Sequence, residues 1–200
     1  MEVTARPTIV VAGLGRCGSS LTMQMLSAGS VPCVGKPPDF EDERTSALSF
    51  DADWFDSLGG VAVKLLDAQR SPLRPFSNHV VIWLDRDPRE QARSMLKMAS
   101  LALPNVDCGR RGVRLVAKSI ERDRELALAR LLSATPHAVL RLDFDDLVLA
   151  PSQTAARLAA FLRPHGHKVD LAPMGKVAKV RPPTCLPGLL EERLIAEAAR

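Results

Sequence analysis

Short apolar runs and longer amphipathic stretches alternate along the chain. The first run, Thr8–Ala12, is rich in β-branched residues and does not alternate polar with apolar positions. This pattern is typical of a strand that is covered on both faces of a parallel sheet. The predicted strands are residues 8–12, 60–67, 79–87 and 137–144.

The stretches between these runs show the spacing of helices. The clearest start follows the third strand, where Asp87 can cap the helix, Pro88 takes its first position and Glu90 completes a capping box. Its predicted buried stripe consists of Ala92, Met95, Leu96 and Ala99. The other predicted helices are residues 19–28, 47–58, 113–133, 151–162 and 189–199, while residues 173–188 are predicted to be irregular.

Strands that alternate with helices predict an α/β fold, a three-layer sandwich with a central parallel sheet. The length of 200 residues favours one domain over residues 1–200. Ligands of such sheets bind at the carboxyl ends of strands, so the residues after Ala12 and after Leu84 are the most informative.

The turn after the first strand has the spacing of a phosphate-binding loop. Glycines at 13 and 18 give the pattern GxxxxG, which lets backbone N–H groups turn toward an anion at a helix start. The nucleotide-hydrolase motif would continue with lysine, but Ser19 and Ser20 follow here, and Arg16 stands inside the loop. The sequence thus predicts an anion site of the P-loop nucleotide-binding type and argues against ATP or GTP hydrolysis.

The string "GLGRCGSSL" resembles the 5′-phosphosulfate loop of sulfotransferases, which often reads Gly-x-Pro-Arg-Ser-Gly-Thr-Thr-Leu. Four positions match identically, two serines replace two threonines, Gly15 replaces proline and Cys17 replaces serine. The resemblance implies that this loop holds the phosphosulfate of 3′-phosphoadenylyl sulfate and that Arg16 stabilises charge on the bridging oxygen. The implied binding residues are Gly13, Gly15, Arg16, Cys17, Gly18, Ser19 and Ser20.

A second string, "WLDRDPREQARS", resembles the 3′-phosphate-binding segment of the same family. Arg86 and Ser94 stand eight residues apart, as in the family, and the resemblance assigns both to the 3′-phosphate of the nucleotide. Ser94 lies seven residues after the cap Asp87, about two helical turns on, so it can face the strand end. Residues 141–162 resemble the late strand and helix of sulfotransferases, whose role is mainly structural.

No clear motif identifies the general base that would take a proton from the acceptor. Protein-tyrosine sulfotransferases carry a glutamate after the first helix, but the comparable stretch here, "CVGKPPDFEDER", has Lys36 near that place. On position alone, Glu41 is the first candidate for the base and Asp39 the second.

The resemblance implies sulfuryl transfer from 3′-phosphoadenylyl sulfate to a hydroxyl or amine of a small-molecule or carbohydrate acceptor. The product is adenosine 3′,5′-bisphosphate and no metal is required. Two alternatives stay open at this point: a P-loop nucleotide kinase or hydrolase, and a nucleotide-binding module that has lost transfer. Because the chain is short for the family, a homodimer is a further option for completing the acceptor site.

The composition of the chain indicates which kinds of ligand and partner it can bind. A net charge of +4 suits an anionic small molecule, but aromatic residues are only 4% and no dense basic block occurs, which argues against nucleic acid. The four cysteines are widely spaced without a CxxC pair, which argues against zinc and favours reduced thiols in a cytoplasmic protein. No signal peptide is apparent, and the apolar runs are too short to span a membrane.

Overall fold

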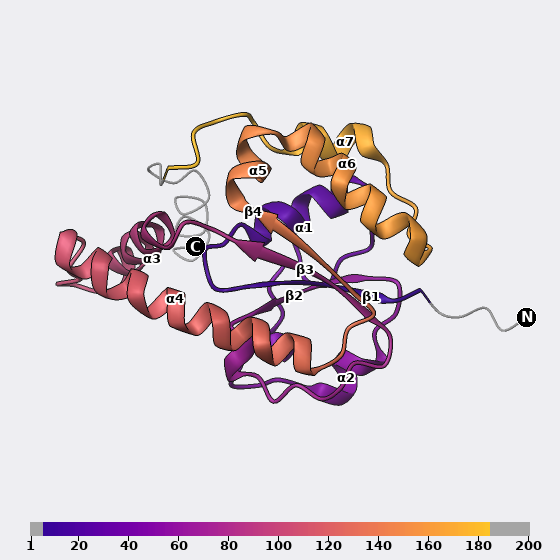
Figure 1. Cartoon of the computed structure of the whole chain (residues 1–200), viewed down its shortest axis with the longest axis horizontal. Helices are drawn as coiled ribbons and strands as arrows, with labels where there is room; N and C mark the ends of the chain where they lie inside the picture. The colour runs from indigo at the N-terminus through magenta and orange to yellow at the C-terminus, as the bar shows by residue number, and fades with distance from the viewer. Residues whose placement is uncertain (1–5, 185–200) are drawn as a thin grey trace, which may run out of the picture.

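A four-stranded parallel sheet forms the centre of the molecule (Figure 1). The computed structural model describes residues 6–184. The strand order is β2-β1-β3-β4, and every neighbouring pair is parallel. The strands are β1 (Thr8–Gly13), β2 (Ala62–Leu66), β3 (His79–Asp85) and β4 (Ala138–Asp143). The four predicted strands and their parallel arrangement are confirmed.

Helices cover both faces of the sheet, which confirms the three-layer sandwich (Figure 1). One face carries α1 (Ser19–Ala28), α5 (Phe144–Leu149), α6 (Pro151–Leu162) and α7 (Leu171–Val177). The other face carries α2 (Ala52–Ser57), α3 (Pro88–Ala102) and α4 (Arg110–Ser133). Short 3-10 turns complete the chain: η1 (Glu43–Thr45), η2 (Ala68–Arg70) and η3 (Arg163–His165).

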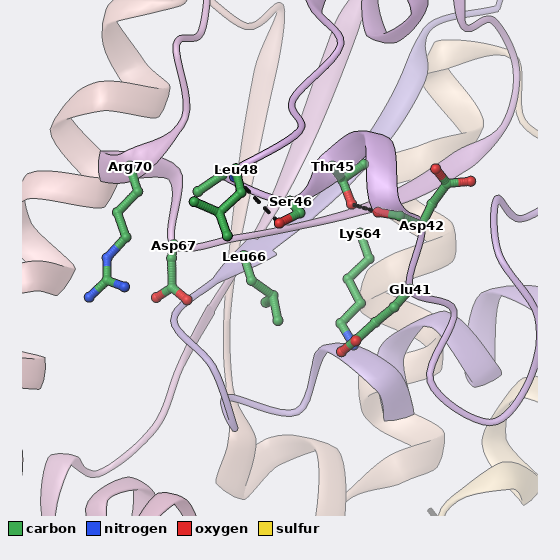
Figure 2. Close-up of a pocket in the computed structure, with 10 residues that line it drawn as sticks. Glu41, Asp42, Thr45, Ser46, Leu48, Lys64, Leu66, Asp67 and Arg70 are labelled. Atoms are coloured by element: carbon green, nitrogen blue, oxygen red, sulfur yellow. Dashed lines mark hydrogen bonds and ion pairs between the residues drawn. The ribbon is translucent and has the colours of Figure 1, made fainter. Parts of the chain in front are cut away.

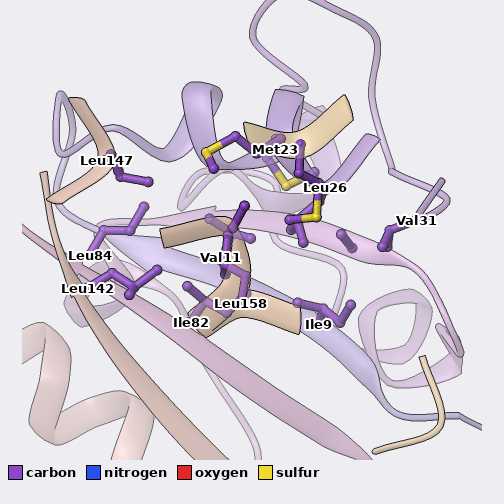
Figure 3. Packing of buried hydrophobic residues seen from close by; sticks show 14 of the residues in the cluster. Ile9, Val11, Met23, Leu26, Val31, Ile82, Leu84, Leu142, Leu147 and Leu158 are labelled. Carbon is purple, nitrogen blue, oxygen red and sulfur yellow. The ribbon is translucent and has the colours of Figure 1, made fainter. Parts of the chain in front are cut away.

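The central strand β1 supplies side chains to both hydrophobic cores. Ile9 and Val11 belong to the core under α1 and α6, and Val10 and Ala12 to the core under α3 and α4. Figure 3 shows Ile9 and Val11 in the first core, together with Leu26 of α1 and Leu158 of α6. All four β1 side chains are fully buried, which explains why this strand shows no alternation of polar and apolar residues.

Several element boundaries differ from the prediction. The helix predicted over residues 47–58 is only α2, because the Asp51 carboxylate accepts a hydrogen bond from the Trp54 N–H (2.9 Å) and starts the helix there. Leu48, expected on its apolar face, is exposed. Helix α4 begins earlier than predicted, and α5 follows β4 directly.

The segment 173–188 was predicted to be irregular, and this is wrong for its first part. Helix α7 ends at Val177 and starts after Asp170, whose carboxylate accepts a hydrogen bond from the Ala172 N–H (3.2 Å). The helix predicted over residues 189–199 lies outside the described residues. Among residues 6–184, no helix combines the length and apolar composition needed to cross a bilayer.

The predicted start of α3 is confirmed. The Asp87 carboxylate accepts hydrogen bonds from the backbone N–H groups of Arg89 (3.0 Å) and Glu90 (2.9 Å), and Pro88 opens the helix. The predicted buried stripe is only partly correct. Ala92 is buried, but Met95, Leu96 and Ala99 are only partly buried. Gln91 and Ser94 are buried instead, because α3 turns polar side chains toward the loop after β1.

Strand register places three loop starts at one edge of the sheet. Gly13, the last residue of β1, pairs with Leu66 of β2 on one side and with Leu84 of β3 on the other. The residues that follow these three positions therefore lie next to one another. This is the edge at which α/β sheets bind their ligands.

Two glycines of the loop after β1 differ in how well they would tolerate a side chain. Gly18 has φ 104°, and a Cβ there would lie 2.8 Å from the Phe144 ring. Gly15 faces open space. We therefore expect Gly18→Ala to lower the free energy of unfolding by about 1–3 kcal/mol, and Gly15→Ala to change it by less than about 0.5 kcal/mol. Urea unfolding of both variants measures these free energies. Equal losses of stability in the two variants would contradict the different roles given to Gly18 and Gly15.

Candidate functional site

The loop between β1 and α1 is held from outside through its carbonyl groups. The Gln91 side-chain amide donates hydrogen bonds to the carbonyls of Leu14 (3.3 Å) and Gly15 (2.8 Å). The Arg86 guanidinium donates to the carbonyl of Arg16 (3.0 Å). In a trans peptide the N–H points opposite to the C=O, so the N–H groups of Gly15 and Arg16 point away from α3. The loop therefore presents backbone donors on one side, as an anion-binding loop must.

Gln91 is a site residue that sequence reasoning missed. Its side chain is 1% exposed, and its carbonyl oxygen accepts a hydrogen bond from Arg124 of α4 (3.3 Å). The Arg124 guanidinium also donates to the carbonyl of Arg86. A glutamine one turn into an amphipathic helix looks like a surface residue, so the sequence carried no local signal of this role.

The two predicted nucleotide-binding motifs meet in space. The Arg16 Nε donates a hydrogen bond to the Ser94 hydroxyl (3.0 Å), and Ser94 is 3% exposed. Arg86 is also buried, and its guanidinium stacks over the Phe144 ring at 4.0 Å. The Arg86 guanidinium further donates to the carbonyl of Pro183 (3.4 Å). The structure thus brings Arg16, Arg86 and Ser94 together, although 78 positions separate Arg16 from Ser94.

The remaining predicted loop residues have different environments. Gly13 packs closely, because a Cβ there would lie 2.7 Å from the Cys17 sulfur and 2.9 Å from the Leu84 carbonyl. Burial raises the pKa of the Cys17 thiol to about 11, and this side chain belongs to the hydrophobic core. Any contact of Cys17 with a ligand is therefore one of its backbone. Ser19 is buried at the start of α1, and the Ser20 hydroxyl accepts a hydrogen bond from Lys64 (3.1 Å).

Lys64 of β2 is a second residue that sequence reasoning missed. It is 4% exposed, and its ammonium also donates to the Asp39 carbonyl (3.1 Å) and the Glu41 carboxylate (2.9 Å). Glu41, the first candidate for the base, is therefore in an ion pair, and Asp39 meets Lys64 through its backbone. A signal was available here, because Lys64 is the only charged residue in the apolar run over residues 60–66.

A pocket of about 340 Å³ opens next to the loop. Figure 2 shows Lys64 and Glu41 on one side of it and Asp67 and Arg70 on the other, with Leu66 between them. Asp67 directly follows β2, and burial raises the pKa of its carboxyl group. The sequence marked neither Asp67 nor Arg70 as a site residue. Within the described part of the chain, no three His, Cys, Asp or Glu side chains are grouped as metal ligands.

The sequence profile of the sulfotransferase family matches residues 66–164. This part of the chain is similar to the sulfotransferase family. The matched region contains Arg86 and Ser94 and extends past α6, while the loop after β1 lies before it. The similarity to the family therefore rests on the second motif and on β4 and α6, independently of the phosphate loop.

A solved structure has a similar fold. The crystal structure of mouse sulfotransferase SULT7A1 complexed with PAP is similar with a TM-score of 0.55 and 15% sequence identity. The match covers 86% of this chain and 62% of the mouse chain, so this chain spans less than two thirds of that protein. A search of curated protein sequences gives no match.

Because Gln91 fixes two loop carbonyls, its removal has a measurable cost. We expect Gln91→Ala to lower the free energy of unfolding by about 1–3 kcal/mol, since it removes the side-chain donor to the Gly15 carbonyl and leaves the Leu14 carbonyl with the Cys17 N–H alone. Arg89→Ala changes an exposed side chain in the same first turn of α3 and is the control, with an expected effect below about 0.5 kcal/mol. Chemical denaturation measures both values. A Gln91→Ala protein as stable as the control would contradict the proposed tether.

Proposed function

We propose that this protein transfers a sulfuryl group from 3′-phosphoadenylyl sulfate to a hydroxyl or amine acceptor and releases adenosine 3′,5′-bisphosphate. The observation that carries the proposal is the meeting of the two motifs. Arg16, from the phosphate loop, contacts Ser94, from the segment that resembles a 3′-phosphate site. A nucleotide with phosphates at both its 5′ and 3′ positions needs two such adjacent anion sites.

The residues present fit this nucleotide. The N–H side of the loop and the Arg16 guanidinium would hold the phosphosulfate, and the donors of Arg86 and Ser94 would hold the 3′-phosphate. Both anchoring side chains of the second motif are buried, so they lie in a fixed geometry. Arg16 would then stabilise the negative charge that develops on the leaving phosphate. The mouse protein's complex with PAP supports this choice of nucleotide.

The alternatives from the sequence are less well supported. A nucleotide kinase or hydrolase needs a lysine after Gly18, where Ser19 stands. Lys64 comes near the loop from β2, but its contacts with Ser20 and Glu41 already account for its position. A nucleotide-binding module without transfer would keep the same geometry, and a transfer assay separates it from an enzyme.

The acceptor is proposed to be a small molecule or carbohydrate. The pocket beside the loop has the volume of a small-molecule site, and it combines charged side chains with Leu48 and Leu66. A second subunit that completes this pocket, and a cytoplasmic location, stay predictions.

Arg86 tests the choice of nucleotide. We expect the wild-type protein to bind adenosine 3′,5′-bisphosphate more tightly than 5′-AMP. A charge-assisted contact contributes about 1.5–3 kcal/mol, so Arg86→Ala should weaken binding of the bisphosphate about tenfold to a hundredfold. Calorimetry with both ligands and both proteins gives the four affinities.

5′-AMP is the internal control in this comparison. It lacks the 3′-phosphate, so its affinity should fall much less in Arg86→Ala, and a general distortion of the site would weaken both ligands alike. Equal wild-type affinities for the two ligands, or tight binding of ATP with magnesium that Arg86→Ala leaves unchanged, would favour the kinase alternative.

Arg16 tests the transfer step. We expect Arg16→Ala to weaken nucleotide binding and to lower the rate of transfer at least a hundredfold, because the side chain is proposed to stabilise the leaving phosphate. Release of adenosine 3′,5′-bisphosphate from 3′-phosphoadenylyl sulfate measures the rate. Unchanged binding and turnover in a folded variant would exclude this role of Arg16.

A further inference from the structure

We infer that Asp67 is the catalytic residue that accepts the proton of the acceptor during sulfuryl transfer. The inference rests on the function proposed above and names a residue at the same site that the sequence motifs do not mark. It replaces Glu41, which sequence position had favoured as the base.

Asp67 lies against the phosphate loop. It follows Leu66, which pairs in register with Gly13, and its backbone N–H donates to the Gly13 carbonyl (3.0 Å). The backbone N–H of Gly15 acts on its carboxyl group and lowers the pKa of that group, while burial raises it. This N–H lies on the donor side of the loop, opposite to Gln91. The carboxylate thus borders the place where the phosphosulfate is proposed to bind.

Asp67 also lines the pocket proposed for the acceptor. Figure 2 shows its carboxylate on the same side of the pocket as Arg70, and Leu66 separates it from the Lys64–Glu41 pair. Asp67 therefore lies between the phosphate loop and the pocket proposed for the acceptor. A proton acceptor needs this position, because it must reach the attacking hydroxyl while that group faces the sulfur.

Glu41 is less suited to the role. Its carboxylate is bound to the buried Lys64 ammonium at 2.9 Å, and 66% of its side chain is exposed. The Lys64 ammonium therefore already occupies an oxygen of the Glu41 carboxylate. We therefore assign Glu41 to holding Lys64 and the loop around it.

The surroundings of Asp67 favour proton uptake. Burial raises the pKa of its carboxyl group, and so does the nearby negative charge of Asp123 on α4, while Arg70 and the Gly15 N–H lower it. Lys64, Glu41 and Asp42 are the other charged groups that line the pocket. The net direction is upward, so Asp67 is a stronger base than an ordinary aspartate.

The reaction balances with this residue as the base. The acceptor oxygen or nitrogen forms a bond to sulfur with its lone pair, and its proton passes to the Asp67 carboxylate. The bond between sulfur and the bridging oxygen breaks, and its electron pair stays on the 5′-phosphate. Asp67 then releases the proton to water.

The variant Asp67→Asn tests whether the Asp67 carboxylate accepts the proton. Asp67 has φ 53°, a left-handed conformation that asparagine also adopts readily. The hydrogen bond from the Asp67 backbone N–H to the Gly13 carbonyl does not involve the side chain, so the loop keeps this contact. The variant removes the basicity together with a negative charge beside the anion site, so calorimetry should give an affinity for adenosine 3′,5′-bisphosphate at least equal to that of the wild type.

Two acceptors of different acidity separate a base from a structural residue. Near pH 8, 4-nitrophenol is mostly ionised and needs little help from a base, whereas phenol keeps its proton. With 3′-phosphoadenylyl sulfate as donor, Asp67→Asn should lower kcat/KM for phenol about a hundredfold or more, and for 4-nitrophenol less than tenfold. The fall of wild-type activity with phenol at acidic pH should disappear in Asp67→Asn, because the ionised carboxylate is the active form.

Glu41→Gln is the comparison variant, and it should affect the two phenols equally. Equal losses for both phenols in Asp67→Asn, or a selective loss for phenol in Glu41→Gln, would overturn the assignment while leaving the proposed function intact. If neither phenol is accepted, hydrolysis of the donor with water as acceptor is measured instead, and its rate should fall in Asp67→Asn and not in Glu41→Gln. A wild-type protein that binds the bisphosphate but neither transfers nor hydrolyses would overturn the proposed function, and this inference with it.

Discussion

The hydrogen bonds from Gln91 and Arg86 to three consecutive loop carbonyls are the constraint on which the site depends. A peptide group has an acceptor on one side and a donor on the other, so its orientation decides whether a loop attracts cations or anions. Here buried side chains after β3 and in α3 bind the carbonyl side. The donor side is thereby turned toward the edge of the sheet, and Arg16 adds a positive charge to it.

Helix α3 buries polar side chains because these side chains bind the loop after β1. Its N-terminal half buries Gln91 and Ser94 beside Ala92, where an ordinary amphipathic helix would bury apolar residues. Buried polar groups are costly unless they are hydrogen-bonded, and here both have partners on the loop. The helix therefore gives up some hydrophobic packing in order to fix the loop.

The parallel register divides the site into two halves. On the β3 side of Gly13 lie Arg86 and Ser94, which are proposed to hold the nucleotide. On the β2 side lie Asp67 and the Lys64–Glu41 pair, which border the pocket proposed for the acceptor. The two acids there differ in environment, because Glu41 is neutralised by a buried lysine whereas Asp67 lies next to a backbone donor. Different tasks for chemically similar groups are a common result of such differences in burial and partners.

By itself the sequence determined the strands, the parallel three-layer arrangement, the start of α3 at Asp87 and the glycine spacing of the loop. These features depend on periodicity, capping and backbone freedom, which act between residues a few positions apart. Only the tertiary structure decided that Gln91 is buried, that Lys64 neutralises Glu41 and that Asp67 borders the loop. The contact between Gln91 and Gly15 joins residues 76 positions apart, and that between Lys64 and Glu41 joins residues 23 apart. Such pairs are chosen by strand order and register, which bring together side chains that no local pattern connects.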